Sequence, residues 1–117
     1  MNYSNFEQGD IVVTDVRFSD TDETKPRPAI IMSNNAYNRS SNDLILFKIT
    51  GTKKNWKFDV NLQKESLKEG ELLKESVIKA DFPIVVNKKR IKQKIGKARE
   101  NIIKEVIAKF QEVIKNN

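Results

Sequence analysis

Short β-branched segments separated by polar turns fill the first half of this sequence, and they constrain the fold more than any other feature. Each segment has the length and the Val, Ile and aromatic content of a strand, and Gly, Asn, Asp and Ser mark the turns between them. The segments are GDIVVTDVRF (Gly9–Phe18), RPAIIMS (Arg27–Ser33), LILFKIT (Leu44–Thr50) and WKFDVNL (Trp56–Leu62). The sequence therefore predicts a mainly β protein.

The remaining segments before the C-terminus are less regular. The composition predicts a polar loop, a turn-rich connector with one helical turn, a loop with a short turn whose helical composition is broken by a glycine, a strand bent at a proline, and a basic helical turn. In that order they are Ser19–Pro26, Asn34–Asp43, Gln63–Ser76 with Gly70, Ser76–Val86 with Pro83, and Asn87–Lys97 ending at Gly96.

The C-terminal segment RENIIKEVIAKFQEVIKNN carries apolar residues at a spacing of about 3.6 residues. They are Ile102, Ile103, Val106, Ile107, Phe110, Val113 and Ile114. This pattern predicts a helix over about Ala98–Lys115, with one face docked on the strands or on a partner. Short strands followed by one terminal helix indicate a small, strongly bent sheet or barrel, formed as a single domain over residues 1–117.

Two residue types are missing, and their absence excludes several kinds of chemistry. The chain has no histidine, so histidine acid–base catalysis and histidine-ligated metals are excluded. It has no cysteine, so disulfides and thiolate metal sites are excluded too. No apolar run approaches the roughly 20 residues of a membrane span, and the N-terminus lacks a signal-peptide pattern. A cytoplasmic protein without metal or membrane partner is expected.

The net charge of +6 is unevenly distributed along the chain. Residues 1–50 carry five Lys/Arg and seven Asp/Glu, a net of −2, whereas residues 51–117 carry seventeen and nine, a net of +8. Such asymmetry suits a polyanionic partner, with nucleic acid the first candidate. A solvated lysine-rich surface explains the same numbers.

Arg27 stands between two prolines at the start of a predicted strand. Because a proline restricts the residue before it, Pro28 limits the backbone of Arg27 and would help to preorganise a guanidinium facing a phosphate. The alternative is an arginine at a strand edge, paired with Asp20 or Asp22. Thr50 ends another predicted strand and is either a simple β-former or a hydroxyl at the barrel rim.

The order of several motifs resembles the MazF/PemK (Kid) family of toxin–antitoxin endoribonucleases over about residues 6–114. The pieces that carry the resemblance are GDIVVTDV (Gly9–Val16), RPAIIMSN (Arg27–Asn34), AYNR (Ala36–Arg39), LILFKIT (Leu44–Thr50), LLKESVIKAD (Leu72–Asp81) and KIGK (Lys94–Lys97). The resemblance implies an SH3-like barrel closed by a C-terminal helix and assembled as a homodimer. It also implies sequence-specific, metal-independent cleavage of single-stranded RNA, without a cofactor, and a cognate antitoxin as partner.

The resemblance assigns roles to particular residues. Arg27 and Thr50 match the arginine and threonine that hold the transferring phosphate, and Asp81 matches a catalytic aspartate that serves as base for the ribose 2′-OH. Lys79 stands where related members carry an arginine, and Ile84-Val85 replaces the usual Arg-Thr; both are departures from the family pattern. A salt bridge to a nearby lysine is the structural alternative for Asp81.

Further residues are predicted to bind RNA around this site. The lysines are Lys25, Lys48, Lys53 and Lys54, and Phe18 would stack on a base unless it is buried in the core. In 2′-OH attack the RNA supplies its own nucleophile, so arginine, threonine and a carboxylate suffice for positioning, charge stabilisation and proton transfer. Two rival functions remain open: an RNA- or DNA-binding barrel without activity, and a CcdB-like gyrase inhibitor.

Overall fold

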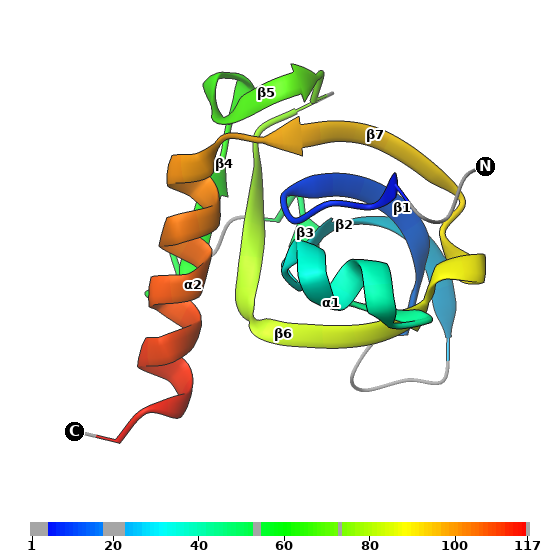
Figure 1. Ribbon diagram of the computed structural model, residues 1–117. Helices are drawn as coiled ribbons and strands as arrows, with labels where there is room; N and C mark the ends of the chain where they lie inside the picture. The colour runs from blue at the N-terminus through cyan, green and yellow to red at the C-terminus, as the bar shows by residue number, and fades with distance from the viewer. Residues whose placement is uncertain (1–4, 18–22, 53–54, 73, 117) are drawn as a thin grey trace.

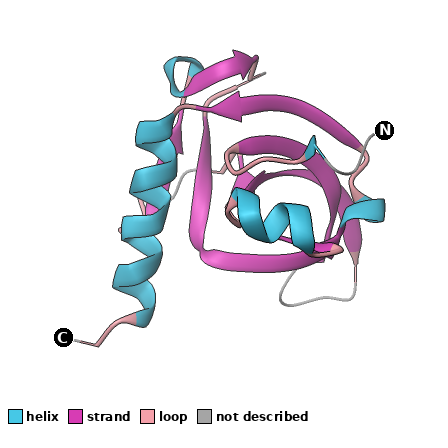
Figure 2. Ribbon diagram, in the orientation of Figure 1, coloured by secondary structure: helices cyan, strands magenta, loops and turns pink. Residues whose placement is uncertain are grey.

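The computed structural model describes residues 5–17, 23–52, 55–72 and 74–116, and all elements lie within these ranges. Strands form the body of the molecule, and two α-helices flank them (Figure 2). In chain order the elements are β1 (Asp10–Arg17), β2 (Thr24–Ile31), α1 (Asn35–Ser40), β3 (Asp43–Thr50), β4 (Asp59–Leu62), η2 (Lys64–Ser66), β5 (Leu67–Gly70), β6 (Ser76–Asn87), η3 (Lys88–Arg90), β7 (Gln93–Ala98) and α2 (Glu100–Ile114).

The strands form one antiparallel sheet in the order β4-β6-β3-β2-β1-β7-β5. Figure 1 shows this sheet curling round on itself, with β6 turning a sharp corner along its length. The pairing of β3 with β6 shifts register between Phe47 and Ile49 of β3, where Phe47 pairs with Pro83 of β6. Among the described residues the end strands β4 and β5 do not pair, so the barrel stays open. The expected SH3-like, mainly β fold with a C-terminal helix is confirmed.

Alternation along the strands divides the apolar side chains between two clusters on opposite faces of the sheet. Ile11 and Ile30 belong to the first cluster, which we call the helix-side cluster because α2 contributes to it. Their neighbours Val12 and Ile31 belong to the second cluster, together with Phe6, Ala29, Leu44, Leu46, Val86 and Ile91. The first half of the chain therefore folds as its period-two pattern predicts.

Helix α2 packs on β6 and β4 through only part of its apolar face (Figure 1). Ile102, Ile103 and Val106 are buried in the helix-side cluster, and the Phe110 ring meets the Phe47 ring edge-on at 5.2 Å. Ile107 in the middle of the helix and Val113 and Ile114 in its last turn are exposed. The predicted helix is confirmed within two residues at each end, but only some of its apolar residues dock on the strands.

Gly9 immediately precedes β1 and lies against Ile103, near the start of α2. Its φ of +94° suits glycine, and a Cβ placed there would lie 2.6 Å from Cδ1 of Ile103. The Gly9 N–H donates to the Ile31 carbonyl, and the Ala98 N–H donates to the Gly9 carbonyl. This turn therefore holds the helix against the sheet at the point where the first strand begins.

Two sequence predictions are wrong. The loop predicted at Gln63–Ser76 contains the strand β5. Of the helical turn predicted at Asn87–Lys97, only Lys88–Arg90 is helical, and Gln93–Ala98 forms the strand β7. Strands β5 and β7 pair with each other, and Gly70, at a φ of +85°, lies against Ile95 and Gly96 where a Cβ would collide with backbone. Gly70 thus permits close strand pairing rather than breaking a helix.

Two smaller differences concern element length. Only Asp59–Leu62 of the predicted strand at Trp56–Leu62 is extended. The connector at Asn34–Asp43 holds the six-residue helix α1, whose N-terminus is capped by the Asn34 side chain accepting from the Tyr37 N–H.

Candidate functional site

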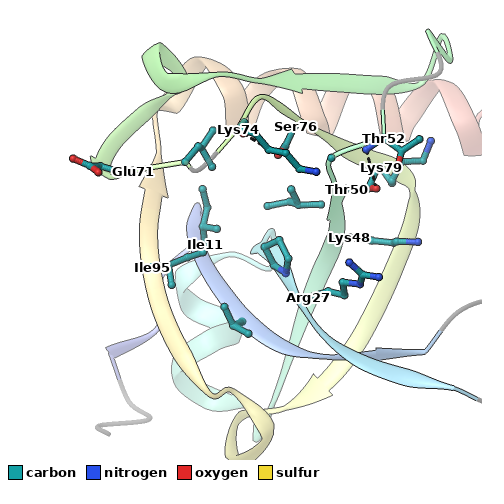
Figure 3. A pocket seen from close by; sticks show the side chains of 15 residues that line it. Ile11, Arg27, Lys48, Thr50, Thr52, Glu71, Lys74, Ser76, Lys79 and Ile95 are labelled. Carbon is teal, nitrogen blue, oxygen red and sulfur yellow. Dashed lines mark hydrogen bonds between the residues drawn. The ribbon is translucent and has the colours of Figure 1, made fainter.

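A cleft of about 670 Å³ opens between the strands that carry most of the predicted site residues (Figure 3). Its walls are partly apolar, and its charged lining residues are the cations of Arg27, Lys48, Lys74 and Lys79 and the carboxylate of Glu71. The remaining lining residues are Ile11, Val13, Pro28, Ile49, Thr50, Gly51, Thr52, Leu72, Ser76 and Ile95. Four cations against one anion make the cleft suited to a polyanion.

Strand β2 brings Arg27 to this cleft. Arg27 pairs with Thr14 of β1, while β3 pairs with β2 only over Ala29–Ile31. Pro26 and Pro28 lie inside the strand and not only at its start. Among the described residues, one edge of this stretch has no strand partner, and proline is tolerated there. The two prolines restrict the backbone that carries the half-buried guanidinium.

Thr50 ends β3 at the mouth of the cleft. Its Oγ1 accepts a hydrogen bond of 3.2 Å from the Thr52 N–H, which forms a small turn at the strand end. Because this bond uses an oxygen lone pair, the hydroxyl proton is left to donate to a ligand oxygen. Next to it, Gly51 leaves room for the side chain of Lys74: a Cβ there would lie 2.6 Å from Nζ of Lys74.

Lys48 and Lys79 lie near Thr50, on β3 and β6 (Figure 3). The Lys48 ammonium sits 4.9 Å from the centre of the Phe82 ring. Nζ of Lys79 lies 2.5 Å from Oδ1 of Asp59, so part of its charge is compensated by that buried carboxylate. Lys79 therefore contributes less positive potential to the cleft than a lysine facing water.

A model of the PemK-like, MazF-like toxins of type II toxin–antitoxin systems matches residues 7–114. The chain belongs to this family. No protein of curated function matches its sequence at a significant level.

Solved structures with similar folds cover nearly the whole of this PemK-like chain. An endoribonuclease from Mycobacterial species is 18% identical, with a TM-score of 0.74, and covers 97% of this chain and 93% of its own. A MazE–MazF structure from Deinococcus radiodurans is 20% identical, with a TM-score of 0.75 and coverage of 97% of each chain. A mycobacterial endoribonuclease in complex with its cognate antitoxin is 16% identical, with a TM-score of 0.72, and covers 95% and 98%. At these identities the likeness shows a shared fold.

The predicted site residues of this PemK-like protein fall into three groups. Arg27, Lys48, Thr50 and Lys79 line one cleft. Lys25 is exposed on β2, and Asp81 is exposed on β6; within the described ranges, neither lines that cleft. Phe18, Lys53 and Lys54 lie outside the described residues, as do Asp20 and Asp22, the expected alternative partners of Arg27.

Asp81 has a neighbour that the sequence did not indicate. Its Oδ2 accepts a hydrogen bond of 2.9 Å from the indole Nε1 of Trp56. The Ile84-Val85 departure lies further along β6, where Ile84 packs on the second cluster and Val85 is exposed.

Sequence reasoning missed Lys74, Trp56 and Asp59 as site residues. Lys74 lies in a segment predicted to be a loop, and its approach to Gly51 depends on how β5 and β6 are connected. In the part of the chain that the structure describes, no group of three or more His, Cys, Asp or Glu side chains is placed to hold a metal ion. None of the described helices is long and apolar enough to cross a membrane.

Proposed function

We propose that this chain is a toxin endoribonuclease that cleaves single-stranded RNA at a short recurring sequence, without a metal. The 2′-OH attacks the adjacent phosphorus, giving a 2′,3′-cyclic phosphate on one product and a 5′-OH on the other. The observation that carries the proposal is the convergence of Arg27, Lys48, Thr50 and Lys79 on one open cleft in a PemK-like chain. The endoribonucleases among the similar structures support it.

Arg27 and Thr50 are the proposed phosphate-binding pair. A guanidinium can donate two hydrogen bonds to phosphate oxygens, and the threonine hydroxyl can donate a third. These donors stabilise the charge that develops on the phosphorane. Charge stabilisation, and not proton donation, is the role proposed for Arg27.

Asp81 is the proposed base for the 2′-OH, with Lys79 as a supporting cation. A carboxylate can accept the hydroxyl proton once it is within hydrogen-bond reach. In the free protein Trp56 occupies one oxygen of Asp81, so RNA binding would have to bring the ribose to the other oxygen or displace the indole.

The proposed partners are single-stranded mRNA, a cognate antitoxin and a second copy of the chain, all in the cytoplasm. Two lysines beside the cleft, Lys48 and Lys74, would bind flanking phosphates, and the acidic tail of an antitoxin would compete for the same cations. Lys25, Lys53, Lys54 and Phe18 stay predictions as further RNA contacts.

A binding barrel without activity is the second candidate. It is favoured by one observation: the Lys79 ammonium is paired with Asp59 and the Asp81 carboxylate is bonded to Trp56, so both of these groups already have protein partners. This alternative predicts RNA binding that weakens with salt but no cleavage.

The deciding experiment is cleavage of a long single-stranded RNA in EDTA by wild-type protein and by Arg27→Ala, with mapped ends and a test for cyclic phosphate. Cuts at one recurring sequence by the wild type alone would support the proposal. Folded wild type that binds RNA without cutting it would favour the binding barrel, and absence of both activities would favour gyrase inhibition. Equal cutting by both proteins would exclude Arg27 from the site.

A further inference from the structure

A second, smaller pocket lies beside the cleft. It has a volume of about 250 Å³ and is lined by Asn55, Trp56, Asp59, Asn61 and Val77. The Lys79–Asp59 ion pair connects the two sites, because Lys79 lines the cleft and Asp59 lines the pocket. The volume of this second pocket is close to the lower end of the range of ligand-pocket volumes, ~300 Å³, and suits one planar ring system.

Asp59 contributes a buried acceptor to this pocket. Its side chain is 6% exposed, and Oδ1 is bound to Lys79. Within the described residues, Oδ2 is buried and has no hydrogen-bond partner. A buried carboxylate oxygen without a donor is costly, so an N–H group from a ligand would be well bound there. Because Lys79 compensates its charge, Asp59 does not repel an approaching polyanion as a lone carboxylate would.

Trp56 contributes a flat aromatic surface to the same pocket. Its side chain is 45% exposed, yet its ring is fixed by the hydrogen bond to Asp81 and by an edge-on contact with Phe58 at 5.2 Å. Exposed, fixed aromatic rings beside a cationic groove are the usual stacking surfaces for unpaired bases. Asn55 and Asn61 add amide donors and acceptors around the rim.

We propose that this Trp56 pocket binds one RNA base adjoining the nucleotide in the cleft, and that Asp59 selects a base with an exocyclic amino group. Adenine, cytosine and guanine each present such an N–H donor, whereas uracil presents one ring N–H between two carbonyl oxygens that a carboxylate would repel. The inference rests on the proposed ribonuclease function and adds a specificity-determining residue to it.

Fluorescence of Trp56, the single tryptophan, reports binding at this pocket without any need for cleavage. Short single-stranded oligodeoxynucleotides are the probes, since they lack the 2′-OH nucleophile. We expect d(A) oligomers, d(C) oligomers and oligomers containing guanine to quench the fluorescence of Trp56. Their affinity should exceed that of d(U) oligomers of equal length by about tenfold or more. Replacing adenine by purine, which removes only the amino group, should weaken binding similarly.

Asp59→Asn should abolish this preference, because an amide can present a donor to uracil. Asp15→Asn is the matched control: it removes the same charge from an exposed site on β1 and should keep the preference. Equal binding of all oligomers to wild type, absence of quenching, or an unchanged preference in folded Asp59→Asn would overturn the inference. If Asp59→Asn does not fold, the adenine-to-purine comparison on wild type decides alone. Failure of RNA cleavage with the base preference intact would count against the ribonuclease proposal and not against this pocket.

Discussion

The indole Nε1 of Trp56 donates a hydrogen bond of 2.9 Å to Oδ2 of Asp81, so the carboxylate proposed as the catalytic base is held by an aromatic side chain beside the cleft. One hydrogen bond thereby connects a proposed step of catalysis to a proposed step of base recognition. A base that stacks on Trp56 and a ribose that approaches Asp81 would compete for, or rearrange, the same contact.

The first prediction tests Asp81 as the base. Asp81→Asn keeps the size of the side chain and an acceptor for Trp56 but removes the basic oxygen, so kcat for RNA cleavage should fall by about 10²-fold or more with little change in KM. Trp56→Phe is the companion variant, because it keeps an aromatic ring and releases Oδ2; it should retain cleavage. Activity of Asp81→Asn within about threefold of wild type would place the base elsewhere.

The second prediction concerns Arg27. Arg27→Ala should lower kcat by about 10²–10³-fold, the usual cost of removing one donor to a charged transition state. Arg27→Lys keeps the charge but loses the two-pronged geometry, so its activity should lie between those of wild type and Arg27→Ala. Circular dichroism and thermal unfolding serve as controls, since the residue is half-buried at a strand edge and both variants should fold. Full activity of Arg27→Lys would mean that only charge matters there.

The third prediction concerns the stability of the Lys79–Asp59 pair. Lys79→Met leaves a buried carboxylate without its partner and should lower the free energy of unfolding by about 2–4 kcal/mol. Adding Asp59→Asn should restore most of that loss, because the uncompensated charge is gone. Urea unfolding of wild type, both single variants and the double variant measures the coupling. Additive losses in the double variant would show that the pair contributes little to folding.

Local sequence patterns predicted the parts of the fold that depend on local preference. The strands at Gly9–Phe18, Leu44–Thr50 and Ser76–Val86 are rich in Val and Ile, and the structure places strands over most of each. Strands β5 and β7 contain LKEG and QKIGKA, whose composition does not favour extended structure. They are extended because they pair with each other and because β7 also pairs with β1, a tertiary effect that no local pattern shows.

The candidate site divides in the same way. Arg27, Lys48 and Thr50 lie on strands that the sequence predicted, so their convergence followed from strand order in a small barrel. Lys74, Trp56 and Asp59 were missed because their positions depend on contacts between segments distant in sequence: Lys74 against Gly51, Trp56 against Asp81, and Asp59 against Lys79. A lone buried aspartate or exposed tryptophan carries no signal of this kind in one sequence.

The last prediction concerns pH and the turn that precedes β1. Nζ of Lys97 lies 3.0 Å from a Glu7 carboxylate oxygen and 3.8 Å from Oδ1 of the buried Asp10, and Lys94 lies 3.2 Å from the same Asp10 atom. The hydrogen bond and the charge of Lys97 lower the pKa of Glu7 below 4.5. Burial alone would lower the pKa of Lys97, but the Glu7 hydrogen bond and the Asp10 charge outweigh it and raise that pKa above 10.5.

These directions fix the pH range in which the ion pair stabilises the fold. The contribution of Glu7 to the free energy of unfolding is fully present above pH 4.5, and it is lost as the pH falls through the lowered pKa of Glu7 in the folded state. The contribution of Lys97 to the free energy of unfolding is fully present below pH 10.5, and it is lost as the pH rises through the raised pKa of Lys97. Glu7→Gln should therefore lower the free energy of unfolding near neutral pH by about 0.5 kcal/mol or less, since Glu7 is largely exposed, and the difference from wild type should vanish in strong acid.

Lys97→Met should cost more than Glu7→Gln near neutral pH, because it also removes one of the two lysines beside the buried Asp10. Urea unfolding of wild type and both variants, near neutral pH and well below pH 4.5, measures both effects. A Glu7→Gln penalty that persists unchanged in acid would show that Glu7 acts through packing and not through its charge. Equal penalties for the two variants near neutral pH would show that Lys94 alone suffices to balance Asp10, and that the turn before β1 depends on Lys97 only through Glu7.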